Sequence, residues 1–309
     1  MNGRFASGAD LGANVGALVA ALLFGASVVA VRVAVRDIPP TSLAVLRFGQ
    51  GAVVLFAVTA LLRPGFLRAE ASRLKTYALL GAIFFALFPL SFNAGLQFTQ
   101  ASRGALMLAT MPIWSMLLAR MIVGERLVAR QILGIAISLC GVAIVVAERG
   151  LVLDSDPIAL LGDGLVMLTA FWGALYGVLA KRVLERDHAL TLVSYAMLIG
   201  TLLLLPIALA EGLVGEIGEL DASLTAILLF LGIPGGAIAF GLWTTSLAQL
   251  SPTQVAVYVN LNPIVAATLG VLLLSERASP LFVVSFVAVI GGVLLVNWPT
   301  GSSPDSAGE

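Results

Sequence analysis

Arg47 is the residue that most invites a chemical role, because it falls about seven residues into a long apolar stretch. An arginine inside a membrane is costly and is expected to face a bundle interior or water. There its guanidinium could bind a substrate carboxylate or phosphate through two hydrogen bonds. The alternative is a structural arginine that donates to freed carbonyls of a broken helix or to a buried acid.

Three acidic residues, Glu125, Glu276 and Asp163, are candidates for binding a proton or a cation. Glu125 and Glu276 end two apolar stretches beside an arginine, and the cost of a charge falls away from the bilayer centre. We therefore favour interfacial anchors that pair with arginine or cap a neighbouring helix. Asp163 begins another stretch, where we favour a first-turn acid that complements the helix dipole over a proton site.

Polar and aromatic residues recur within the apolar stretches, and we expect some of them to line a substrate cavity. Aromatic rings with a few amides suit a moderately apolar ligand that is zwitterionic or neutral. The alternative is hydrogen bonding between helices, worth about 0.6–2 kcal/mol per bond. The candidates are Asn93, Gln97, Trp172, Tyr176, Trp243, Thr244, Tyr258, Asn260 and Asn262.

Four prolines interrupt the apolar stretches and predict kinks: Pro89, Pro112, Pro234 and Pro263. Each removes a backbone donor and frees a carbonyl at depth in the membrane. The kinks could let helices flex, or they could be static bends satisfied by neighbours. Pro234 belongs to a Gly-Ile-Pro-Gly-Gly break at residues 232–236, which predicts irregular backbone.

The segment Pro112–Arg126 recurs as Pro263–Arg277, so the chain contains an internal repeat. Proline, isoleucine, the apolar positions and the closing Glu-Arg align at an offset of 151 residues. The same offset pairs Gly81 with Gly232, and Gly141-Val142 with Gly292-Val293. A repeat of this length predicts one structural unit used twice.

Composition places these stretches in a membrane. Apolar residues make up 60% of the sequence and charged residues 11%, against about 45–50% and 25% in soluble domains. Runs of 18 or more apolar residues recur, as in membrane helices. The net charge is zero, with no basic patch for nucleic acid, and Cys140 stands alone, so we expect no disulfide, metal site or cofactor.

The fold expected is an all-α polytopic membrane protein with ten transmembrane helices in two five-helix repeats. The repeats cover residues 14–147 and 159–297, followed by a polar cytoplasmic tail at 298–309. The expected helices are 11–31, 41–62, 76–98, 103–123, 130–147, 159–181, 190–210, 224–247, 253–274 and 280–297.

Lysine and arginine predict the orientation, because cytoplasmic loops carry their excess. With the N-terminus inside, inner helix ends hold eleven basic residues and outer ends four, so both termini are expected in the cytoplasm. Since five is odd, the second repeat enters the membrane inverted. Inverted repeats are typical of transporters that alternate access to a site at the membrane midplane.

Two five-helix repeats, each closing with Pro, an apolar stretch, Glu-Arg and a Gly-Val helix, resemble the EamA type of the drug/metabolite transporter superfamily. Phe24-Gly25 and Trp172-Gly173 agree with an aromatic-Gly pair that this family tends to have. The resemblance covers residues 14–297 and implies an inner-membrane carrier, often an exporter of amino acids, metabolites or toxic compounds. Arg47 resembles an arginine frequent in the family across many substrates, which favours its structural interpretation.

The small multidrug relatives use a glutamate in their first helix as a proton site, whereas no acid lies between Leu11 and Arg32 here. The resemblance therefore does not carry that coupling mechanism over to this chain.

The function expected is secondary active or facilitative transport, with export favoured, of a small organic metabolite such as an amino acid or drug-like compound. The expected partners are this substrate and the lipid bilayer, with the protein a monomer or a homodimer. Carriage of phosphorylated or nucleotide-linked sugars is the alternative within the fold, although it would need more basic residues in the cavity. An intramembrane enzyme is disfavoured, since no Gly-x-Gly-Asp or His-Glu-x-x-His motif is present. A membrane sensor without transport stays open.

Overall fold

The computed structural model describes residues 8–63, 65, 71–99, 101–148, 156–218, 220–274 and 279–298. Within these ranges every regular element is a helix. In chain order the elements are α1 Gly8–Ala34, α2 Pro40–Leu62, α3 Ala71–Gly81, η2 Ala82–Leu87, α4 Phe88–Phe98, α5 Ala101–Leu108, α6 Met111–Ile122, α7 Ala129–Glu148, α8 Pro157–Leu184, α9 Ala189–Glu211, α10 Leu213–Gly218, α11 Ala222–Gly232, η3 Ile233–Ile238, α12 Ala239–Gln249, α13 Pro252–Ala256, η4 Val257–Asn260, α14 Leu261–Leu274 and α15 Pro280–Asn297.

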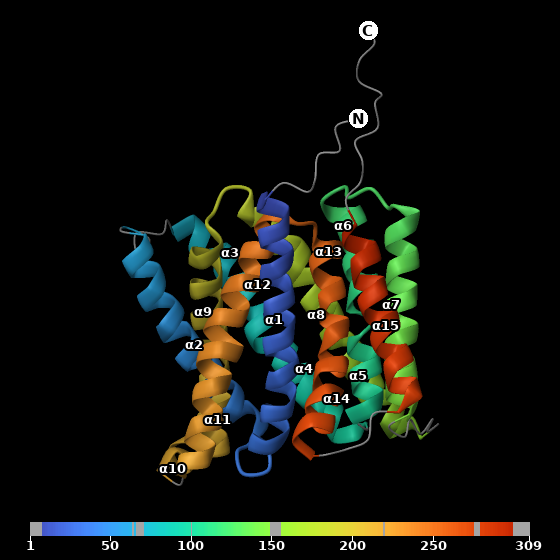
Figure 1. The fold of residues 1–309 in the computed structure, drawn as a ribbon. Helices are drawn as coiled ribbons and strands as arrows, with labels where there is room; N and C mark the ends of the chain where they lie inside the picture. The colour runs from blue at the N-terminus through green and yellow to red at the C-terminus, as the bar shows by residue number, and fades with distance from the viewer. Residues whose placement is uncertain are drawn as a thin grey trace.

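Nine helical stretches of 18 to 28 residues within the described ranges are long and apolar enough to cross a membrane. The predicted ninth helix is present as a further stretch, divided into α13, η4 and α14 of 5, 4 and 14 residues. The expected all-α membrane fold is therefore confirmed. We call the side on which α1 begins and α15 ends the terminal face, at the top of Figure 1, and the opposite side the far face.

The packing of the helices repeats when the two halves are exchanged. The contact of α4 with α8 matches that of α12 with α1, and α6 on α8 matches α14 on α1. The contact of η2 with α9 likewise matches that of η3 with α2, while α7 packs on its own counterpart α15. Figure 1 shows α7 and α15 side by side at one edge of the bundle. These exchanges are the packing expected of two inverted repeats.

A short π-helix interrupts the third helix of each repeat at the same position. In the first repeat, α3 and α4 have 11 residues each and flank the six-residue η2. In the second, α11 and α12 also have 11 residues each and flank the six-residue η3. Both π-helices thus lie at the midpoint of a long helix, where such segments often mark functional sites.

Glycines let the backbone approach each π-helix closely. A Cβ on Gly81 would lie 2.4 Å from the Ala196 carbonyl oxygen, and one on Gly200 would lie 2.5 Å from the Gly81 oxygen. In the other repeat, a Cβ on Gly51 would lie 3.1 Å from the Gly232 oxygen. The neighbouring atoms are backbone, so they cannot turn aside as a side chain would.

The predicted fourth and ninth helices are both broken immediately before their prolines. A turn at residues 109–110 separates α5 from α6, and the 3₁₀ segment η4 precedes α14. The Met107 carbonyl accepts from both the backbone N–H and the hydroxyl of Thr110, at 3.1 and 2.6 Å, so this oxygen stays bonded within the turn. Pro112 and Pro263 thus begin the helices after the breaks, rather than kinking continuous helices.

Gly81→Ala is expected to destabilise the protein, because the added methyl must displace the α9 backbone. Overpacking of this kind typically costs about 1–3 kcal/mol. Thermal unfolding of the purified full chain in detergent measures the effect. Gly177→Ala is the matched control, since a Cβ there meets nothing within 4 Å. Equal midpoints for the two variants would contradict the close-approach argument.

Candidate functional site

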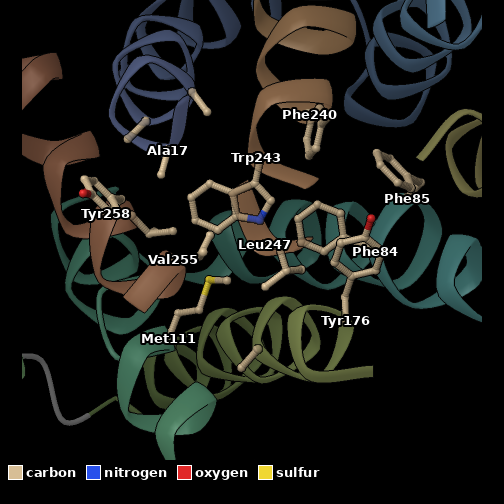
Figure 2. Packing of buried hydrophobic residues seen from close by; sticks show 14 of the residues in the cluster. Ala17, Phe84, Phe85, Met111, Tyr176, Phe240, Trp243, Leu247, Val255 and Tyr258 are labelled. Atoms are coloured by element: carbon tan, nitrogen blue, oxygen red, sulfur yellow. The ribbon is translucent and has the colours of Figure 1, made fainter. Parts of the chain in front are cut away.

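A cluster of aromatic rings occupies the centre of the molecule at the level of the π-helices. Phe84 of η2 stacks on Tyr176 of α8 with centroids 4.5 Å apart, and its ring meets Phe240 of α12 at 5.6 Å. Phe240 also contacts Phe85 at 5.1 Å and Phe24 of α1 at 4.8 Å. Figure 2 shows the labelled rings Phe84, Phe85, Tyr176 and Phe240 around Trp243, on helices of both repeats. This aromatic cluster joins α1, η2, α8 and α12.

The predicted cavity residues divide into enclosed and partly accessible groups. Tyr176, Thr244 and Asn260 have no exposed surface, and Trp243 and Tyr258 have 4% and 5%. Asn93, Trp172 and Asn262 are partly exposed, as is Arg47, and Gln97 is exposed. A ligand at the level of the aromatic cluster would therefore require side chains or helices to move.

Several polar atoms near the centre are buried without a hydrogen-bond partner. Among the described residues these include Asn262 Oδ1, whereas the Tyr176 hydroxyl and Thr244 Oγ1 lie close enough to bond each other. On α2 they include Arg47 Nε and Gln50 Oε1. Because native proteins satisfy most buried polar groups, the unpartnered atoms of Arg47 and Gln50 suggest that a ligand or ordered water supplies the partners.

Two predicted site residues instead bind other side chains. Asn260 donates through Nδ2 to Ser138 Oγ of α7 at 3.0 Å. The Tyr258 hydroxyl donates to Asn14 Oδ1 of α1 at 2.7 Å. These bonds join η4 to α7 and to the beginning of α1, so they fix the packing of the broken helix. The structure does not bring these two residues together with Asn93 and Gln97 of α4.

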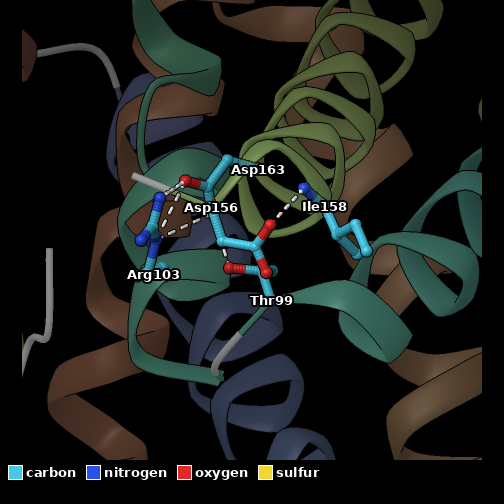
Figure 3. Close-up of polar contacts among 5 residues, drawn as sticks. All are labelled: Thr99, Arg103, Asp156, Ile158 and Asp163. Atoms are coloured by element: carbon cyan, nitrogen blue, oxygen red, sulfur yellow. Dashed lines mark hydrogen bonds and ion pairs between the residues drawn. The ribbon is translucent and has the colours of Figure 1, made fainter. Parts of the chain in front are cut away.

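Asp163 forms a buried ion pair near the far face (Figure 3). Arg103 donates through Nε to Asp163 Oδ2 at 2.9 Å and through Nη2 to the same oxygen, while Thr99 Oγ1 donates to Oδ1 at 2.5 Å. This pair joins the beginnings of α5 and α8. The sequence analysis considered a helix-dipole role or a proton site and did not anticipate Arg103, which is 60 residues away.

Glu125 lies at the terminal face, where its carboxylate meets the beginning of α13. Ser251 Oγ donates to Oε1 at 2.6 Å, and Thr253 Oγ1 donates to Oε2 at 3.0 Å. The contact joins the end of α6 in the first repeat to the second repeat, which is the cap of a neighbouring helix considered above. Its repeat counterpart Glu276 lies outside the described residues.

Lys181 makes a polar contact between helices that could not be predicted from the sequence. Its ammonium donates to the carbonyl oxygens of Leu247, Ala248 and Leu250 at 2.8–3.1 Å. These carbonyls end α12, where a cation also complements the helix dipole. A lone lysine at the end of an apolar stretch signals a membrane boundary, but not which helix it caps.

Comparison with known proteins identifies the type of molecule. Residues 11–147 and 160–298 each match the EamA-like transporter family. The chain belongs to this family. Transporters of this family are multi-pass membrane proteins, in agreement with the fold, and the chain is a small-molecule transporter.

Relatives along nearly the full length carry transporter names. An uncharacterized transporter of Archaeoglobus fulgidus is 29% identical, over 89% of this chain and 91% of the relative. A probable terminal-alkyne amino-acid exporter of Streptantibioticus cattleyicolor is 30% identical over 75% and 76%, respectively. A probable amino-acid metabolite efflux pump of Escherichia coli is 25% identical over 89% and 91%. A crystal structure with 18% identity superposes with a TM-score of 0.76, over 92% of this chain and 95% of that one, and shows the shared fold.

Asp163→Asn is expected to destabilise this EamA-like transporter, because it leaves Arg103 charged, buried and without its carboxylate partner. Breaking one side of a buried pair typically costs about 3–5 kcal/mol. Thermal unfolding in detergent measures the loss, and the double variant Arg103→Gln/Asp163→Asn should recover part of it. An unchanged midpoint for Asp163→Asn would contradict the argument that Arg103 needs a carboxylate partner in its buried position.

Proposed function

We propose that this EamA-like transporter exchanges small organic metabolites, of which amino acids are the first class to test, by alternating access around the aromatic cluster. The observation that carries the proposal is the pair of π-helices at equivalent midpoints of α3–α4 and α11–α12. Two matched irregular segments at mid-depth, in inverted repeats, suit helices that bend in turn around a central site. The names of two relatives, an amino-acid exporter and an amino-acid metabolite efflux pump, support the substrate class.

The contacts at the terminal face support a closed gate on that side. Glu125 ties α6 to α13, and Lys181 ties α8 to the end of α12. In the sequence Glu276 and Ser102 occupy the positions equivalent to Glu125 and Thr253. An inverted repeat would therefore use the second pair to close the far face when the first pair opens.

The distribution of lysine and arginine supports an orientation with both termini in the cytoplasm. The membrane proposed is the inner membrane of a bacterial cell. The terminal face would then be the cytoplasmic face, and the conformation described would be closed toward the cytoplasm. A carrier of phosphorylated sugars is less well supported, because Arg103 and Lys181 are already engaged by Asp163 and by α12.

Counterflow in proteoliposomes tests the transport function. Vesicles loaded with one unlabelled amino acid should accumulate the labelled compound transiently and saturably, because a carrier returns loaded in both directions. The panel includes amino acids, nucleosides and cationic drugs, with and without a pH gradient. Empty vesicles provide the control, and the absence of flux for every member would contradict transport of these classes.

A cross-link between Glu125→Cys and Ser251→Cys by a short bis-methanethiosulfonate reagent, in a Cys140→Ser background, is expected to abolish counterflow. The native side chains meet at 2.6 Å between Oε1 and Oγ, and the reagent replaces the length lost from the glutamate, so the cross-link would hold the terminal face closed. Reduction should restore transport, and each single variant controls for the substitutions. Full transport by the cross-linked protein would contradict opening at this contact.

A further inference from the structure

Arg47 is a cation in the middle of the bundle for which the described residues provide no paired anion. Its Nε is buried and lacks a hydrogen-bond partner, and the ion pairs seen among the described residues are Arg73–Asp187 and Arg103–Asp163. The guanidinium carbon lies 4.8 Å from the ring centroid of Phe48. We propose that Arg47 binds the carboxylate of a transported monocarboxylate whose apolar body lies against the aromatic cluster. The proposal rests on the transport function proposed above and names its substrate class.

The depth of Arg47 follows from the contact of α2 with the π-helix. A Cβ on Gly236 would lie 3.6 Å from the Arg47 carbonyl oxygen, and η3 is flanked by 11 helical residues on each side. Arg47 therefore lies near the middle of the membrane-spanning bundle. Arginines near helix ends can extend their charge to the membrane surface, but a residue at this depth needs a partner inside the protein.

The repeat indicates that the architecture does not require this arginine. α2 and α9 each have 23 residues and align at an offset of 149, which pairs Gly51 with Gly200. The same alignment pairs Arg47 with Ala196, whose carbonyl oxygen would lie 2.4 Å from a Cβ on Gly81. Since alanine serves at the same crossing in the second repeat, the guanidinium is an addition to the packing rather than a part of it.

Gln50 supplies a second ligand group on the same helical face. It lies three residues after Arg47, so the two side chains are neighbours on the surface of α2. Its Oε1 is buried without a hydrogen-bond partner. Rotation of the amide lets Gln50 accept from an ammonium or hydroxyl, or donate to a carboxylate. The two residues together present a cation and an adaptable amide.

The surroundings favour a carboxylate over a phosphate. One guanidinium balances one negative charge, whereas a phosphate monoester carries about −1.5 to −2 near pH 7. Arg47 is adjacent to Phe48, whose ring lies 5.3 Å from Phe85 and 5.9 Å from Phe240. These rings would cover an apolar ligand body, but they carry no positive charge to balance a second negative charge on the ligand. A monocarboxylate with an aliphatic or aromatic side chain fits this arrangement.

Ligand-induced thermal stabilisation of the full chain in detergent tests the proposal independently of transport. The probes are L-phenylalanine, L-leucine, 3-phenylpropanoate and 4-methylpentanoate, each beside its methyl ester, together with phenyl phosphate. At least one acid should stabilise the wild type, and its ester should bind about 10- to 100-fold more weakly, as expected for loss of a charge-assisted pair.

Arg47→Gln should weaken binding of that acid by a similar factor without changing binding of the ester. Arg47→Lys keeps the charge but loses the two-pronged geometry, so an intermediate affinity is expected. Arg120→Gln is the matched control, because Arg120 is an exposed arginine in the last turn of α6, and it should bind as the wild type does.

Four results would overturn the inference: equal binding of acid and ester, no effect of Arg47→Gln, stabilisation by phenyl phosphate alone, or no stabilisation by any acid. Counterflow with no dependence on Arg47 would defeat this inference and leave the transport function standing. Arg47-dependent binding of an acid without counterflow would support Arg47 as a carboxylate-binding residue and contradict the transport function.

Discussion

Backbone hydrogen bonding inside the bilayer is the constraint on which this structure depends. A chain that crosses a membrane must satisfy its amides within the protein, so departures from the α-helix are tolerated only where other bonds replace those lost. The π-helices η2 and η3 meet this condition by shifting the bonding register rather than breaking it. At the turn before α6, the Met107 carbonyl accepts from both the backbone and the side chain of Thr110. Irregular backbone is thus concentrated at the centre, where a carrier needs its helices to bend.

Glycine makes this irregularity compatible with close packing. The backbone of α9 approaches α3 at Gly81 and Gly200, and the backbone of α2 approaches η3 at Gly51. α7 and α15 meet in the same way, since a Cβ on Gly292 would lie 2.5 Å from the Gly134 oxygen. With little hydrophobic driving force between helices in lipid, such contacts let dispersion forces hold the bundle together. The helices interrupted by η2 and η3 are therefore packed against α9 and α2, which continue without a π-helix.

Much of the fold could be predicted from the sequence, because length and apolarity of each helix and the offset of 151 residues are one-dimensional signals. The π-helix in the first repeat could not, since Phe84 and Phe85 stand where the second repeat has Gly235 and Gly236. Pro234 lies inside η3, whereas Pro89, which predicted a kink in the third helix, lies two residues after the end of η2. The candidate site was harder still: the partners of Asp163 and Lys181 lie 60 or more residues away, and no local pattern encodes such pairs.

The repeats share a backbone but not a set of central side chains, and this difference supports the proposed place of substrate recognition. If both repeats were identical, the two inverted arrangements would have equal energy and the centre would present the same groups toward either face. In the alignment of the repeats, Phe84 and Phe85 of η2 correspond to Gly235 and Gly236 of η3, and Arg47 corresponds to Ala196. Groups needed for packing and bending recur in both halves, as Gly81 and Gly232 do. Side chains present in one half only are not required for the shared packing. A solute has no two-fold symmetry of its own, so we expect these side chains to recognise it.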